Sequence, residues 1–81
     1  MTGASVRIDE EWDAGERGCG ELVLELRQRL EGMQPGQVIK VTALDPGAPA
    51  DMPVWCRLTG HTLVSMEHPV YLIRRKGGSG G

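Results

Sequence analysis

The chain has 81 residues, enough for one domain built around one hydrophobic core. Its 40% hydrophobic and 25% charged residues are typical of a soluble globular domain, and no apolar run approaches the roughly 20 residues of a membrane span. A formal charge of −2 provides no overall positive field for nucleic acid, which speaks against a nucleic-acid partner.

The ends of the chain differ in composition from its middle. Residues 1–5 are small and polar, and residues 77–81 contain only glycine and serine, so we expect a flexible N-terminus and a flexible tail around one domain over residues 6–76. The start lacks the basic and apolar regions of a signal peptide, which predicts a cytoplasmic location. In that compartment the two cysteines are expected to be free thiols.

The first third of the chain predicts a strand, a loop and a helix. Apolar and charged residues alternate loosely over 6–13, which favours a weak strand, and the glycines of 14–18 indicate a loop. From residue 20 to about 32 the apolar side chains instead recur with helical spacing. This face consists of Leu22, Val23, Leu26, Leu30 and Met33.

The rest of the chain predicts three strands and a second helical region. The β-branched run 38–44 is typical of a central strand. Asp45-Pro46 resembles an N-cap followed by a proline at the first helical position. Because an interior Pro53 is expected to break a helix, we predict a helical turn near 46–51 and a short helix over 53–59. That helix would turn Val54, Trp55 and Leu58 to the core.

Two further strand patterns cover 62–67 and 70–76, with a tight hairpin at His68-Pro69. The order is therefore β-α-β-α-β-β. Right-handed crossovers place both helices on the same side of the sheet. We predict an α+β fold, a two-layer sandwich in which two helices cover one face of a four-stranded mixed sheet.

Cys19 is the strongest candidate for chemistry. It lies between Gly18 and Gly20, directly before the predicted helix and close to Arg17. A helix N-terminus and a neighbouring cation both favour the thiolate, which is the nucleophilic form of cysteine. The residues alone leave two interpretations open, a reactive thiol or a small inert residue in a loop.

The other candidate side chains give weaker signals. Cys56 lies in an apolar helical pattern and is expected to be a buried core residue. His61 follows the second helix, where its imidazolium would face the carbonyl end, and His68 occupies the hairpin. The spacing of these residues matches no usual metal-ligand pattern, so we predict neither a metal site nor a cofactor.

Several short segments together resemble the TusA/SirA-like sulfur-carrier family. Trp12-Asp13-Ala14 is similar to the strand leading to that family's reactive cysteine, and Cys19 falls at the cysteine itself. Glu21 matches a residue often found just after the cysteine. Further segments that resemble the family follow in the same order along the chain. They are Met33-Gln34-Pro35-Gly36, Asp45-Pro46, Asp51-Met52-Pro53, Trp55-Cys56, His61, Leu63-Val64 and Tyr71-Leu72-Ile73-Arg74.

One segment departs from the family pattern. The family motif is Cys-Pro-x-Pro, whereas this chain has Cys-Gly-Glu-Leu over residues 19–22. The arginine that often precedes the cysteine is displaced by one position, to Arg17. Proline fixes the backbone angle φ that a helix start needs. Gly20 lacks this constraint, so the backbone around Cys19 is expected to be more flexible.

The resemblance implies a sulfur carrier, that is, a sulfurtransferase in which one cysteine accepts persulfide sulfur and relays it to an acceptor protein. Cys19 would be the catalytic residue, with Arg17, Gly20 and Glu21 as supports of the thiolate or persulfide. The implied partners are a cysteine desulfurase or another sulfur donor, and an acceptor protein thiol. Two alternatives stay open: a non-catalytic module that binds protein or RNA through Arg74-Arg75-Lys76, and a redox switch between Cys19 and Cys56.

Overall fold

The computed structural model describes residues 7–77, and of Cys19 it describes the backbone alone. The expected flexible N-terminus 1–5, Val6 at the start of the expected first strand, and 78–81 of the expected tail lie outside the described residues. The predicted order β-α-β-α-β-β is confirmed. The elements are β1 (Glu10–Gly15), α1 (Cys19–Glu31), β2 (Val38–Ala43), α2 (Ala48–Thr59), β3 (Thr62–Glu67) and β4 (Val70–Arg74).

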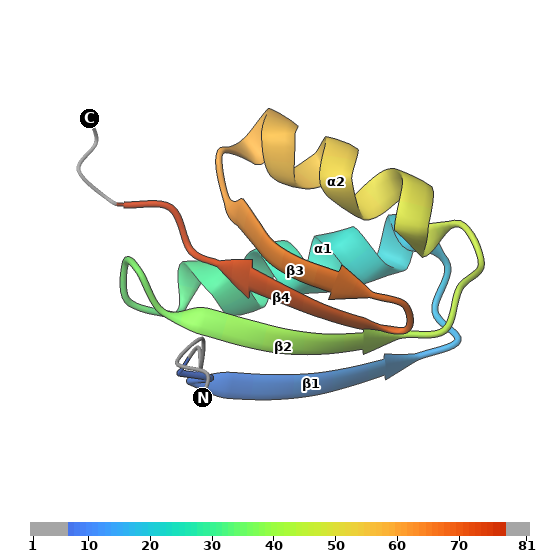
Figure 1. Cartoon of the computed structure of the whole chain (residues 1–81), viewed down its shortest axis with the longest axis horizontal. Coiled ribbons are helices and arrows are strands. Elements are labelled where there is room, and N and C mark those ends of the chain that lie inside the picture. Colours follow the sequence, from blue (N-terminus) through green and yellow to red (C-terminus); the bar gives the residue numbers. More distant parts are fainter. Residues whose placement is uncertain (1–6, 78–81) are drawn as a thin grey trace.

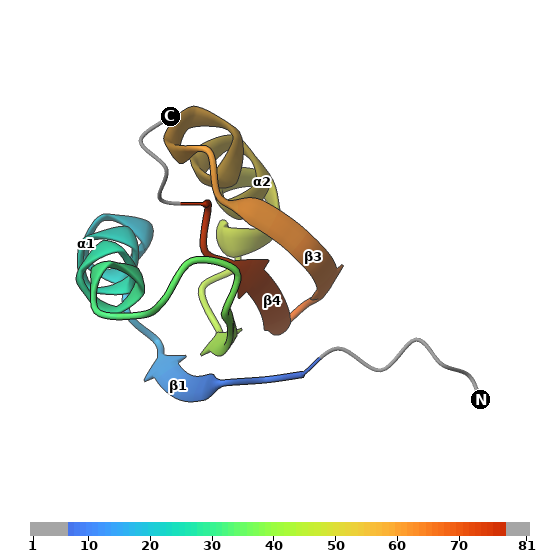
Figure 2. The same ribbon diagram turned by 90° about the vertical axis from the view of Figure 1, so that its left-hand side faces the viewer.

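The four strands form one mixed sheet in the order β1-β2-β4-β3. β1 and β2 run parallel, whereas β4 pairs antiparallel with both β2 and β3 (Figure 1). Both helices lie on the same face of the sheet (Figure 2). The predicted two-layer α+β sandwich is therefore confirmed. Among the described residues, neither helix is long and apolar enough to cross a membrane.

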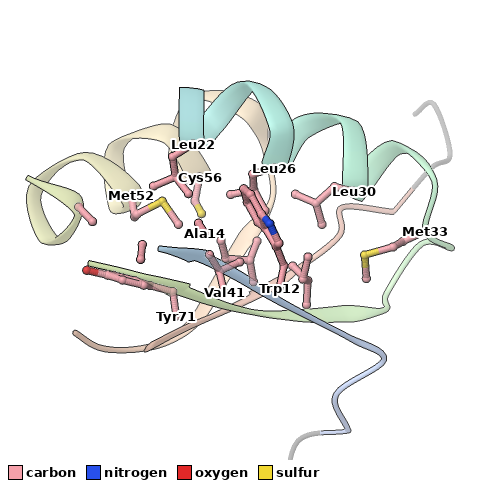
Figure 3. Close-up of a cluster of buried hydrophobic side chains, with 14 residues drawn as sticks. Trp12, Ala14, Leu22, Leu26, Leu30, Met33, Val41, Met52, Cys56 and Tyr71 are labelled. Atoms are coloured by element: carbon pink, nitrogen blue, oxygen red, sulfur yellow. The ribbon is translucent and has the colours of Figure 1, made fainter. Parts of the chain in front are cut away.

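The core lies between the helices and the inner face of the sheet (Figure 3). Its largest fully buried side chains are mostly aliphatic, as the scarcity of aromatic residues predicts. Tyr71 and Trp12 are the aromatic members, and the Tyr71 hydroxyl is satisfied by a 2.6 Å hydrogen bond shared with His68 Nδ1. The cluster consists of Trp12, Ala14, Leu22, Leu26, Leu30, Met33, Ile39, Val41, Ala43, Ala48, Met52, Cys56, Tyr71 and Ile73.

The first strand begins and ends later than predicted, because the alternation in sequence was weak there. β1 covers Glu10–Gly15, so Ala14 and Gly15, which were assigned to the loop, belong to the sheet. Ala14 is buried, and Gly15 pairs with Ala43 of β2. Before the strand, Asp9 is already fixed to β2, since its Oδ2 accepts the N–H of Val38 at 2.9 Å.

The second helical region is one continuous helix, so the predicted break before Pro53 was wrong. α2 runs through Pro53 from Ala48 to Thr59, with Pro49 in its first turn, where no intrahelical N–H bond is lost. An interior proline costs one backbone bond, and the burial of Met52 and Cys56 on one face offsets this loss. The N-cap is Gly47 and not Asp45.

The rotation of α2 also differs from the prediction. The buried residues of the helix are Ala48, Met52 and Cys56, spaced four apart along one face. Val54 and Leu58 therefore point outward, with 47% and 79% of their surfaces exposed. The continuous helix sets this rotation from its first turn, whereas a helix that began at residue 53 would have been free to turn Val54 inward.

Candidate functional site

Cys19 is the first residue of α1, one position earlier than the predicted helix start. The N-cap is Gly18, whose extended backbone (φ −69°, ψ 162°) turns the chain into the helix and whose carbonyl accepts the N–H of Leu22 at 2.9 Å. Glycine has no side chain, so this cap leaves the N–H groups of the first turn without the usual side-chain acceptor. The first turn is therefore a positively polarised surface that can stabilise an anion at Cys19.

The strand before the site determines where α1 begins. Gly15 ends β1 with a positive φ of 62°, and its N–H is held by Asp13 Oδ1 at 2.9 Å. The Gly15 carbonyl accepts the N–H of Leu44 at 2.9 Å, just after β2. Since β1 and β2 are parallel, the helices that follow them both start at the same end of the sheet, as Figure 1 shows. Cys19, the first residue of α1, therefore lies at the end of the sheet where α2 also begins.

Arg17 is held along the β1–α1 loop by several contacts. Its Nη1 donates to the carbonyl of Ala14 at 3.0 Å, and its Nε lies 3.7 Å from Glu25 Oε1. The guanidinium also lies 5.7 Å from the centre of the Trp12 ring. These contacts fix a positive charge within the loop that precedes Cys19, and they make Arg17 a support of the loop itself.

A second arginine, on α1, contacts residues of the strand that leads to this loop. Arg29 contacts Glu25 and Glu10 at 2.9 and 3.1 Å, and its guanidinium lies 4.7 Å from the centre of the Trp12 ring. Glu25 therefore joins Arg29 to Arg17. This network joins the first helix to the first strand, and because its side chains are partly exposed to solvent, it contributes little to overall stability.

Gly20 and Glu21 complete the first turn, and both are exposed. A methyl group added to Gly20 would meet no other atom within 4 Å, so nothing crowds this side of the turn. Glu21 places a carboxylate in the first turn, which interacts favourably with the helix dipole. The predicted supports Arg17, Gly20 and Glu21 therefore all flank Cys19, on the loop and on the first turn.

Cys56 is buried, as predicted. Only 3% of its surface is exposed, and it belongs to the core cluster that also contains Met52 and Leu22 (Figure 3). Burial raises the pKa of the Cys56 thiol to about 11, so the thiol stays protonated at neutral pH. Because the thiolate is the nucleophile, Cys56 is unsuited to sulfur transfer and to disulfide exchange with Cys19.

His61 is not the positively charged imidazolium that was predicted at the end of α2. Its Nδ1 accepts the backbone N–H of Lys76 at 3.0 Å, and its ring centre lies 5.6 Å from that of Trp55. Accepting a hydrogen bond requires a neutral ring, and burial together with Lys76 and Arg75 lowers the pKa of His61. Among the described side chains, no three His, Cys, Asp or Glu residues gather around a possible metal position.

An apolar hollow lies beside the first turn of α1, and the sequence interpretation missed it. Its volume is about 310 Å³, and it is lined by Gly20, Val23, Asp51, Val54, Trp55 and Leu58. The sequence interpretation placed Val54 and Leu58 in the core. The four-residue spacing of Met52 and Cys56 was the signal that these two, and not Val54 and Leu58, form the buried face.

Comparison with known proteins assigns the family. Residues 10–75 match the sequence model of the family described as "Sulfurtransferase TusA", which covers every element of the fold. The chain belongs to the TusA family. The family resemblance predicted from the sequence is thereby confirmed.

Individual relatives of this TusA-family chain cover nearly its whole length. "Sulfur carrier protein TusA" of Pseudomonas aeruginosa (strain PAO1) is 34% identical over 73 residues, covering 85% of this chain and 92% of the relative. The protein of the same description from Pseudomonas syringae pv. syringae is 34% identical over 76 residues, covering 89% and 90%. The similarity therefore includes the β1–α1 loop as well as the sheet.

Proposed function

We propose that this TusA-family protein is a sulfur carrier that accepts sulfur as a persulfide on Cys19 and relays it to the thiol of an acceptor protein. The observation that carries the proposal is the position of Cys19 as the first residue of α1, behind a glycine cap. The relatives named as sulfur carriers support it. The burial of Cys56 leaves Cys19 as the candidate nucleophile.

The chemistry needs two transfers between thiols. The Cys19 thiolate attacks the terminal sulfur of a donor persulfide, an S–S bond forms at Cys19, and the donor leaves as a thiolate. An acceptor thiolate then attacks the terminal sulfur of Cys19–S–SH and releases the Cys19 thiolate. The sulfane sulfur keeps its oxidation state throughout, so the relay itself requires no cofactor. A cysteine desulfurase is the proposed class of donor.

The neighbours of Cys19 have proposed roles as supports of the anion. The N–H groups of the first turn have no side-chain acceptor, and a helix N-terminus stabilises a negative charge at its first residue by about 0.3–1 kcal/mol. Arg17 supports the site by holding the preceding loop in place through its contacts with Ala14 and Glu25. Exposed Gly20 leaves room for the incoming thiol, and Glu21 stabilises the turn through the helix dipole.

The test is sulfur loading, measured by intact mass. We expect the protein to gain one sulfur atom when incubated with a cysteine desulfurase and cysteine, and a Cys56→Ala variant to gain it equally. A Cys19→Ala variant should gain none. Equal loading of the Cys19→Ala variant, or no loading of the wild type, would refute the proposal and favour a non-catalytic binding module on the same fold.

A further inference from the structure

The apolar hollow beside the first turn of α1 has a second hollow next to it, also lined by residues of both helices. Trp55 and Leu58 line both hollows, and the two hollows together are here called the α1–α2 groove. The helices that form its walls are seen end-on in Figure 2. The second hollow has a volume of about 480 Å³, and it is lined by Arg27, Glu31, Trp55, Leu58, Thr59, His61, Arg75 and Lys76.

The far end of the groove is closed by the segment that follows β4. Arg75 Nε donates to the carbonyl of Leu30 on α1 at 2.7 Å. The next residue, Lys76, donates its backbone N–H to His61 after α2 at 3.0 Å. The segment therefore spans from one helix end to the other and carries two cations to this end of the groove.

The charge at the far end is positive and largely uncompensated. Glu31 is the single carboxylate in its lining, and it is paired with Arg27 at 3.2 Å. No ion pair among the described residues neutralises Arg75 or Lys76. Both cations also disfavour protonation of His61. The local charge at this end of the groove is therefore positive, whereas the formal net charge of the whole chain is −2.

The near end and the middle of the groove are apolar. Leu58 and Val54 are exposed hydrophobic residues of α2, and Val23 faces them from α1. The near end borders Gly20, directly after Cys19, and its one charged residue is Asp51. This part of the groove has one aromatic residue, Trp55, and no cation, so it does not provide the successive aromatic platforms and continuous basic track of a nucleic-acid site. It does suit a protein segment with mixed apolar and acidic side chains.

We propose that the α1–α2 groove docks a segment of the partner protein that exchanges sulfur with Cys19. Apolar side chains of that segment cover Val54 and Leu58, and its carboxylates lie at Arg75 and Lys76. The inference rests on the proposed function, because it is the reaction at Cys19 that brings a partner cysteine to the near end. Charge complementarity at the far end then orients the segment along the groove.

The length of the groove predicts how far the acidic residues of the partner segment lie from its reactive cysteine. Gly20 and Glu31, which line its two ends, are about 16 Å apart along the axis of α1. An extended chain covers this distance in about five residues. The partner is therefore expected to carry acidic residues about five positions from its reactive cysteine, with apolar residues between them.

Peptides with an activated disulfide test this arrangement without a natural partner. Each has a cysteine as its mixed disulfide with thiopyridine, followed by apolar residues and ending in either acidic residues or lysines, and each is made in both chain directions. Attack by the Cys19 thiolate forms a disulfide with the peptide and releases thiopyridine, which absorbs light. A small neutral thiopyridyl disulfide measures the intrinsic reactivity of Cys19.

We expect the acidic peptide in one direction to react about tenfold faster than its lysine counterpart, although the negative net charge of the protein favours the lysine peptide. Lys76→Glu and Leu58→Ser should each abolish most of this preference. The matched controls Arg74→Glu, on exposed sheet surface, and Leu24→Ser, a 58% exposed leucine outside the groove, should retain it.

The outcomes separate the two proposals. If the acidic peptide is no faster than the lysine peptide, or if Lys76→Glu and Arg74→Glu behave alike, the docking proposal is wrong while sulfur transfer at Cys19 stands. If Cys19 fails to react even with the small disulfide, the proposed function itself fails. Thermal unfolding of every variant shows whether a lost preference comes from lost folding.

Discussion

The two cysteines occupy different backbone settings, one inside the core and one at the start of a helix. Cys56 is enclosed by the core, and its pKa is raised to about 11 by the cost of burying a charge. Cys19 begins a helix, in a turn whose neighbours Gly18 and Gly20 are exposed. Cys56 is therefore an inert thiol because of its position in the core, whereas Cys19 is a candidate nucleophile because of its position at a helix start.

This difference predicts the stoichiometry of alkylation. Iodoacetamide at pH 7.5 should modify one thiol in the folded protein and two in denaturant, because the Cys56 thiol is both buried and protonated. Peptide mass mapping should place the native modification on Cys19. Rapid native labelling of Cys56 would contradict the burial described above, and a Cys56→Ala variant provides the control with one thiol.

The lowered pKa of His61 is expected to make stability depend on pH. The pKa of His61 is lowered in the folded state by burial and by Lys76 and Arg75, so the unfolded chain binds a proton more readily. The contribution of His61 is therefore fully present above the unfolded pKa of about 6.5 and is lost as pH falls through the lower folded value. We expect the free energy of unfolding to fall between pH 7.5 and 5.5 more steeply in the wild type than in His61→Gln. Equal slopes in urea titrations would show that His61 has no such role.

Residue identity alone predicted some of these environments and missed others. The burial of Cys56 followed from its apolar neighbours, and the special position of Cys19 followed from the adjacent glycines. The neutral, hydrogen-bonded state of His61 was missed, because its partner is a backbone N–H fifteen residues away. No local pattern encodes such a contact, since it depends on where β4 ends relative to α2.

The first helix explains how the chain tolerates a motif without prolines. Residue 20 is in the first turn, where the N–H has no intrahelical acceptor, and a side chain there meets open space. Leu22 differs in both respects. Its N–H is bonded to Gly18 at 2.9 Å, and its side chain is fully buried in the core. The residue at the second proline position of the family motif, Leu22, is thus part of the core of this chain.

We therefore expect opposite effects of proline at these two positions. Gly20→Pro should keep the fold and should preserve or raise the unfolding temperature, since proline suits the first turn of a helix. Leu22→Pro should lose at least about 2–5 kcal/mol, because it removes a backbone bond and a buried leucine side chain. Urea denaturation measures both effects. Gly20→Ala serves as the control that separates loss of glycine flexibility from proline itself, and a Gly20→Pro variant that unfolds would contradict this description of the first turn.

The second helix shows the limit of local rules. Pro53 predicted a break, yet α2 continues through it because the buried face of Ala48, Met52 and Cys56 spans the proline. That face could not be identified before the helix start was known, and a shift of the start rotates every side chain around the axis. The exposure of Val54 and Leu58, and with it the α1–α2 groove, is a direct consequence.

The arrangement of the whole molecule was predictable because the order of elements constrains it strongly. Parallel strands joined by a helix cross over in the right-handed sense, so both helices were expected on one face, and they are (Figure 2). The place of β4 between β2 and β3 did not follow from the order of elements. It depends on long-range pairing, such as Ile39 with Ile73 and Leu63 with Ile73.

The central place of β4 has a consequence for folding during translation. Before residues 70–74 leave the ribosome, β2 has only β1 beside it, and β3 has no neighbouring strand at all. Tyr71 and Ile73, two of the largest fully buried side chains, are also still missing from the core. The nascent chain can therefore form its helices and the β1–β2 pair early, but the sheet closes in a single late step once β4 inserts between strands made before it.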